Sequence, residues 1–290
     1  MLVYIFSVLA ACANVASSVV QRKANKDQPS ADNLSWRLIV DLVHDPIWFL
    51  GILGIIAGFL LQAAALSTGA LAVVEPILIV ELPLTLVLAG VVFGQHLHGR
   101  EWTATAAITL GLAGALYFLS PTGGTGSGVP ALTWIIGIAV NVAVVGVLVA
   151  VARRESTGDT LAAGLLGIAT GTAFGLTAAL IKAVTEALSR GGFVAIFTTW
   201  QTYAMVIAGV LAMFLLQSAL NEGPLVAAQP GFTVADPIVS ILWGVLAFGE
   251  GLRGGVNLAL AALCAIALGW GVVRLSHSPV LTHSPATDAE

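Results

Sequence analysis

Acidic residues inside otherwise apolar stretches are the feature of this sequence that could do chemistry. Glu75, Glu81 and Asp236 each lie within a run of mostly aliphatic residues, and Lys182 lies within another such run. An ionisable side chain costs free energy in hydrocarbon, so it usually faces a cavity or a partner. Glu81 and Asp236 lie nearest the middle of their runs. They predict a site that binds a proton or a cation, with Glu75 assisting.

Prolines accompany these acids. Pro76 and Pro83 lie on either side of Glu81, while Pro230 and Pro237 lie on either side of Asp236. A proline inside a helix removes a backbone donor and releases the carbonyl one turn earlier. We therefore expect four helix-breaking prolines and freed carbonyls, such as that of Ile79, beside the carboxylates. The alternative is that the prolines only kink the helices for packing.

Other polar residues within apolar runs are further candidates for a solute path. Gln62 and Gln217 occupy matching places before two short turns, and Gln229 corresponds to Glu75 in an internal repeat described below. Trp200 and Lys182 complete the candidate set, although Lys182 could instead extend toward the outer surface. Uncharged polar residues such as Asn14 more often join helices to one another.

The composition places these residues in a membrane. The chain has 290 residues, of which 58% are hydrophobic and 9% are charged, and its mean hydropathy is +0.98. Soluble domains carry about 25% charged residues. Lys and Arg number 11 against 15 Asp and Glu, so a nucleic-acid-binding protein is excluded. We predict an all-α, polytopic helical membrane protein.

Nine segments are long and apolar enough to be spans, each needing roughly 20 residues. They cover residues 2–20, 47–66, 70–94, 102–120, 131–152, 161–188, 196–218, 224–248 and 255–274. Eight Lys and Arg residues fall in loops on one side and two on the other. Positive loops stay in the cytoplasm, so we expect a multi-pass protein of the cell membrane with its N-terminus outside and its C-terminus inside.

An internal repeat relates two parts of the chain. Residues 65–83 match residues 219–237 without a gap, at a constant offset of 154, and the match includes both pairs of prolines. Paired spans are five crossings apart, so the copies run in opposite senses, as in many secondary transporters. We predict two inverted four-helix repeats, 1–120 and 161–274. They are joined by 121–160, which holds a Gly-rich outer linker, the fifth span and a cytoplasmic loop. A disordered tail, 275–290, follows.

The repeat unit resembles that of the drug/metabolite transporter superfamily. In each copy Ala-Leu is followed by a short turn and a proline-containing helix: Ala65-Leu66 to Pro83, and Ala219-Leu220 to Pro237. Gly94-Gln95 and Gly249-Glu250 then precede a Gly-rich helix. Within the superfamily, nine spans resemble the NIPA-like magnesium transporters more than the ten-span EamA-like members. Gln95 stands where the family usually has Glu.

The resemblance implies a secondary transporter that moves a small polar metabolite or drug-like solute by alternating access. A magnesium or other divalent-cation transporter, with Glu81 and Asp236 as metal ligands, is the alternative. A non-transporting membrane scaffold is a second alternative. We expect no enzymatic activity and no cofactor beyond a coupling proton or cation. The expected partners are the lipid bilayer and a small molecule or ion, and the sequence leaves a homodimer open.

Overall fold

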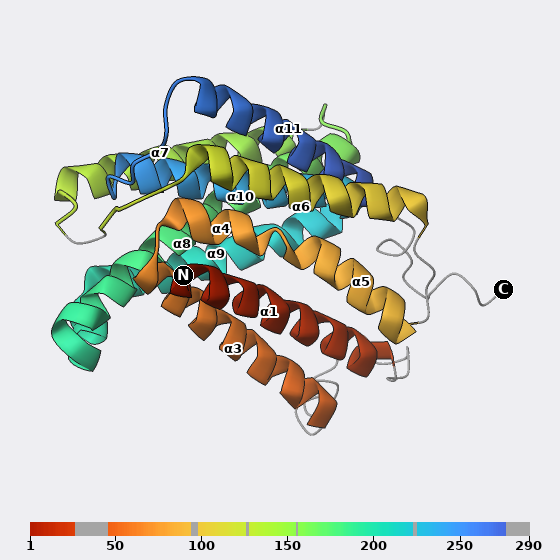
Figure 1. The fold of residues 1–290 in the computed structure, drawn as a ribbon, viewed down its shortest axis with the longest axis horizontal. Helices are drawn as coiled ribbons and strands as arrows, with labels where there is room; N and C mark the ends of the chain where they lie inside the picture. Colours follow the sequence, from red (N-terminus) through yellow and green to blue (C-terminus); the bar gives the residue numbers. More distant parts are fainter. Residues whose placement is uncertain (27–45, 94–97, 126–127, 155, 223–224, 277–290) are drawn as a thin grey trace.

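The chain folds as a bundle of α-helices (Figure 1). This computed structural model describes residues 1–26, 46–93, 98–125, 128–154, 156–222 and 225–276. Its helices are α1 (Leu2–Lys26), α3 (Pro46–Thr68), α4 (Leu71–Leu78), α5 (Glu81–Phe93), α6 (Gly99–Leu119), α7 (Ala131–Ala152), α8 (Asp159–Thr198), α9 (Trp200–Glu222), α10 (Leu225–Leu246) and α11 (Val256–Ser276). Within these ranges no strand forms, and one isolated β-bridge joins Thr122 to Gly251. The predicted all-α class is confirmed.

The surface of the bundle is apolar. Large aliphatic side chains such as Leu110, Leu246 and Val256 are more than two-thirds exposed, at 71%, 74% and 75%. Exposed apolar surface on this scale is expected where lipid, rather than water, is the solvent. In the described residues six helices are long and apolar enough to cross a membrane: α6, α7, α8, α9, α11 and the Phe49–Thr68 part of α3. These helices support a multi-pass membrane protein.

Glycines let neighbouring helices approach closely. A Cβ atom on Gly54 of α3 would lie 2.9 Å from that of Ser17 in α1, and the Ser17 hydroxyl donates a 2.6 Å hydrogen bond to the Gly51 carbonyl. Gly111 of α6 would similarly meet the Cys264 carbonyl of α11 at 2.7 Å. Small residues at helix crossings are the usual means of association in a bilayer, where the hydrophobic effect does not drive helices together.

The long helix α8 packs most intimately against α10. Three glycines on one face of α8, at 167, 171 and 175, contact the α10 backbone or side chains around Ala228, Phe232 and Val239. Most of α8 from Ala162 to Thr185 is buried. It ends beyond the predicted span, at Thr198, after a sharp kink at Gly192, which adopts φ +65°. This conformation is accessible to glycine at little cost.

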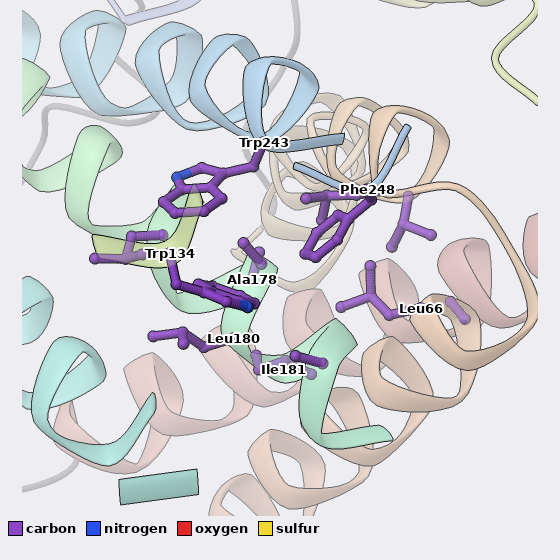
Figure 2. Packing of buried hydrophobic residues seen from close by; sticks show 13 residues of the cluster. Leu66, Trp134, Ala178, Leu180, Ile181, Trp243 and Phe248 are labelled. Carbon is purple, nitrogen blue, oxygen red and sulfur yellow. The ribbon is translucent and has the colours of Figure 1, made fainter. Parts of the chain in front are cut away.

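An aromatic cluster lies within the core. The Trp134 ring lies 5.2 Å from that of Trp243 and 6.0 Å from that of Phe248, centroid to centroid, and Figure 2 shows the three rings around Ala178 of α8. This cluster joins α7, α8 and α10, and Phe248 lies just beyond the end of α10, two residues before Glu250.

The predicted span 70–94 is two helices. α4 ends at Leu78 and α5 begins at Glu81, with Ile79 and Val80 between them. Pro76 lies inside α4 and Pro83 lies in the first turn of α5, a position where a missing backbone donor is tolerated. By contrast α10 continues through both Pro230 and Pro237. The expectation that this second pair breaks its helix is therefore wrong.

Contacts with α8 accompany the unbroken helix at the second proline pair. The α10 backbone lies directly against the glycines of α8, and neighbouring helices can support a proline-containing helix in a membrane.

Candidate functional site

The three acids predicted from the sequence line one cavity of about 350 Å³. We call it the acidic cavity. It is lined by Asn14 of α1, Gln62 of α3, Glu75 and Leu78 of α4, Ile79, Glu81 and Leu82 at the α4–α5 break, Phe174 of α8, and Phe232, Thr233, Asp236 and Pro237 of α10. It thus draws side chains from six helices, four in the first half of the chain and two in the second.

Glu81 enters the cavity because the chain breaks just before it. As the first residue of α5 it stands at a corner, and the Asn14 side-chain amide donates a 2.6 Å hydrogen bond to its Oε1. The bond ties α1 to α5 and fixes the direction of the carboxyl group. Glu75 and Glu81 are six residues apart, about 120° in an uninterrupted helix. The break at Ile79 and Val80 lets both line the same cavity.

Glu75 is the most buried of the three acids, with 3% of its surface exposed. The Gln62 side-chain amide donates a 2.9 Å hydrogen bond to Glu75 Oε1. Gln62 belongs to α3, the helix that precedes the short turn into α4. A carboxyl group this far from water needs such a donor, a bound cation or a proton of its own.

Asp236 comes from the other half of the chain. It lies on α10, where the Ser240 hydroxyl, one turn further on, donates a 3.3 Å hydrogen bond to Oδ1. Gly171 of α8 passes so close that a Cβ atom on it would lie 2.9 Å from the Asp236 backbone nitrogen. α8 therefore positions the turn of α10 that carries the acid.

The lining suits a positively charged occupant. It combines three carboxyl groups, two side-chain amides and one threonine, and none of the described lining residues is Lys, Arg or His. Two aromatic rings, Phe174 and Phe232, complete the wall, and aromatic faces also attract cations. The same carboxyl groups could carry protons.

The three carboxyl groups do not form a compact metal-ligand cluster. In the part of the chain that the structure describes, no three His, Cys, Asp or Glu side chains form a group that could hold a metal ion. The carboxyl groups therefore line the cavity without converging on one point.

The backbone carbonyl expected from Pro83 is not free. The Leu82 backbone N–H donates a 3.1 Å hydrogen bond to the Ile79 carbonyl, which replaces the bond that Pro83 cannot make. The expectation of a freed oxygen at this position is wrong, because the carbonyl accepts a hydrogen bond from the third following residue where a regular helix would use the fourth. Side chains thus dominate the polar surface there.

Three further candidates lie outside the cavity. Gln217, the counterpart of Gln62, is exposed. Trp200 is 47% exposed, and its ring meets that of Trp134 edge-on at 5.4 Å. Gln229 is buried on α10 but does not line the cavity, and its Oε1 has no hydrogen-bond partner among the described residues.

Lys182 does not extend to the surface. Its side chain is 2% exposed, and its ammonium group lies 3.3 Å from Glu250 Oε1. It also donates a 2.8 Å hydrogen bond to the Gly69 carbonyl. The pair forms a second buried charged centre, separate from the cavity lining.

Sequence reasoning missed Glu250 as a site residue. It lies between two predicted spans, where a charged residue is expected to meet water, and no local signal marks it as buried. Phe174, Phe232 and Thr233 were also missed, because only the packing of α8 against α10 shows which of their faces borders the cavity. Several other predicted features, including Gln95 and nearly all of the 275–290 tail, lie outside the described residues.

Comparison with known proteins identifies one relative. The chain is 28% identical over 253 residues to an uncharacterized protein of Corynebacterium glutamicum, and the match covers 86% of each chain. No family model matches the sequence, and no solved structure matches it. The similarity over most of both lengths indicates a shared overall fold.

Proposed function

We propose that this chain is a secondary transporter of the drug/metabolite transporter superfamily, which moves a small polar or drug-like solute across the cell membrane by alternating access. The observation that carries the proposal is the acidic cavity, where Glu75 and Glu81 from the first half of the chain meet Asp236 from the second. Sites between two halves, near the membrane midplane, are typical of such transporters.

The packing of the helices supports the proposed inverted repeat. α1 contacts α3 as α8 contacts α9, while α6 contacts α11 and α4 contacts α10. In the sequence repeat, α1 corresponds to α8, α3 to α9, α4 to α10 and α6 to α11, so equivalent helices make equivalent contacts.

Nine spans complete the proposal. α4 and α5 together would form one broken span, and α1 and α10 would add two more to the six helices that meet the length and hydropathy requirements. An odd number of spans places the termini on opposite sides, and the positively charged loops favour a cytoplasmic C-terminus. Discontinuous spans are the elements that form binding sites in many transporters.

The mechanism follows from the lining. A solute or coupling cation would bind the three carboxyl groups in exchange for protons, while the amides of Asn14 and Gln62 keep Glu81 and Glu75 oriented toward the cavity. Neutralising buried charge stabilises the loaded cavity, and it lowers the barrier to switching the side of access.

The test begins with a thermal-shift screen of the purified protein against amines, amino acids and magnesium chloride, because a ligand of the folded state raises its melting temperature. Flux of each binder is then measured in proteoliposomes for wild type, Glu81→Gln and Asp236→Asn. Properly inserted variants should lose at least about tenfold in rate, as expected for loss of roughly 1.4 kcal/mol of binding. Transport at the wild-type rate by both variants contradicts the mechanism.

A divalent-cation transporter remains the second candidate, favoured by the three carboxyl groups. Magnesium keeps several of its waters when it binds proteins, so a cavity without a tight metal cluster among the described residues is compatible with a hydrated ion. Uptake of magnesium into dye-loaded proteoliposomes decides between the two. A complete absence of flux for every solute, with no binder in the screen, would favour a membrane scaffold.

A further inference from the structure

The ion pair between Lys182 and Glu250 is a buried charged pair that lies outside the lining of the acidic cavity. Its nitrogen and oxygen lie 3.3 Å apart, and the two side chains are 2% and 0% exposed. Removing two charges from water costs free energy that their attraction only partly returns, so an apolar pair would often serve stability as well. A contribution to folding stability alone therefore does not explain this buried ion pair.

Glu250 holds the first turn of α4. Its Oε1 accepts a 2.5 Å hydrogen bond from the Leu71 backbone N–H, and its Oε2 accepts one of 2.9 Å from that of Ala72. The first N–H groups of a helix have no partner within the helix, and its N-terminus attracts negative charge. Ala70, the residue before α4, offers no side-chain cap. Glu250 therefore caps α4 from a connection 179 residues away in sequence.

Lys182 completes the attachment on the other side of the turn. It donates a hydrogen bond of 2.8 Å to the Gly69 carbonyl. Lys182 of α8 and Glu250 therefore contact the α3–α4 connection from both sides. The space around Glu250 is full: a Cβ atom on Gly124 or Gly244 would overlap its side chain. The carboxylate is thus fixed by contacts from separate segments of the chain.

The Lys182–Glu250 pair lies between the acidic cavity and a second cavity. This second cavity has a volume of about 380 Å³ and lies at the end of the bundle where the chain begins. Its lining includes Val3, Gly69, Val73, Gly124 and Lys182. Glu75 is four residues beyond Leu71, about 6 Å along α4, and borders the acidic cavity. Any opening of the cavity toward this end must move the first turn of α4 away from Glu250.

We propose that Glu250, held by Lys182, is the positioning residue for α4, and that this pair keeps the acidic cavity closed at the amino-terminal end of the bundle. The pair separates when the cavity opens to that face of the membrane, and it re-forms when the cavity opens to the other face. The inference rests on the proposed transport function, because a scaffold would have no need to open.

The test measures access to the cavity directly and needs no transported solute. Thr233→Cys places a thiol in the cavity of a chain whose own cysteines are removed by Cys12→Ser and Cys264→Ala. Its labelling rate by a membrane-impermeant methanethiosulfonate reagent is measured from each face in oriented vesicles. Adding Lys182→Met with Glu250→Gln removes both charges and leaves no unpaired ion. We expect labelling from the amino-terminal face to rise about tenfold, with little change from the other face, as the open population increases.

Two further variants complete the test. Glu101→Gln is the matched control, because Glu101 is an equally buried carboxylate at another helix N-terminus, where its Oε2 accepts a hydrogen bond from the His98 backbone N–H. It should leave both labelling rates unchanged. Glu250→Asp keeps the charge but shortens the reach to Leu71 and Ala72, so it should give a smaller rise from the same face and serves if the double variant does not fold.

The outcomes separate this inference from the proposed function. Unchanged labelling in folded variants overturns it, and so does an equal rise from both faces, which is what general loosening would produce. A protein that transports no solute contradicts the proposed function instead, whereas the labelling result still reports whether the pair controls access.

Discussion

The Asn14 side-chain amide donates a 2.6 Å hydrogen bond to Glu81 Oε1 and so joins α1 to the corner where α5 begins. Space for this contact comes from Gly58 of α3, because a Cβ atom there would overlap the Asn14 amide oxygen. A polar residue of a kind that more often joins helices is thereby in direct contact with a candidate binding group. The contact yields the first prediction.

Asn14→Leu should weaken solute binding. A hydrogen bond to a charged group contributes about 1.5–3 kcal/mol, so loss of the donor to Glu81 should reduce affinity by roughly tenfold or more. The measurement is a thermal-shift titration with any solute that binds the wild-type protein. Asn141→Leu is the control, since Asn141 is a buried asparagine that donates to the Thr172 carbonyl, away from the cavity lining. Equal losses in both variants would argue against a specific role for Asn14.

Gln62 and Gln217 provide a matched pair from the two halves. Gln62 donates to Glu75, whereas Gln217 is exposed on the surface of α9. We expect Gln62→Leu to slow transport about tenfold, for the loss of a hydrogen bond worth roughly 1.5 kcal/mol to a carboxyl group. Gln217→Leu should keep the wild-type rate, because this side chain is exposed and does not line the acidic cavity. Flux in proteoliposomes distinguishes them, and a similar effect of both substitutions would contradict this placement.

Gly171 should tolerate no larger side chain. In Gly171→Ala the new Cβ atom would lie 2.6 Å from the Phe232 carbonyl and 2.9 Å from the Asp236 nitrogen, so α8 and α10 must separate. Overpacking of this kind costs about 1–3 kcal/mol. The melting temperature in detergent should fall. Gly146→Ala on α7, where no atom lies within 4 Å of the new group, should leave it unchanged or raise it.

Substitution of Trp134 should reduce folding stability, whereas substitution of Trp200 should leave transport largely intact. Trp134 is 3% exposed at the centre of the aromatic cluster, so Trp134→Ala should cost about 3–5 kcal/mol of folding free energy. Trp200 is half-exposed and lies outside the acidic cavity. Trp200→Ala should therefore retain transport, with only a small change in the melting temperature. A large loss of solute affinity in Trp200→Ala would show that Trp200 contacts the solute after all.

The sequence is sufficient to predict the helices because hydropathy and length are local properties. The structure places α7 at Ala131–Ala152, the predicted span, and α11 within about two residues of its prediction at either end. Depth within an apolar run is also local, so the amino-acid sequence alone marks Glu75, Glu81 and Asp236 as unusual. Local information does not say which way a side chain faces around its helix.

Packing between distant segments decides which way each polar side chain faces and where a helix breaks. Gln62 and Gln217 look alike in the repeat, yet one bonds to Glu75 and the other faces outward, because helix rotation depends on neighbouring helices. Prolines at equivalent positions border a break between α4 and α5 but lie inside a continuous α10, where glycines of α8 support the backbone.

Glu250 lies in a connection that sequence analysis assigns to water. Burial beside Lys182 and the first turn of α4 arises only when segments far apart in the chain come together. Hydropathy selects what enters the bilayer, whereas the partners of each polar group are set by contacts between residues distant in sequence.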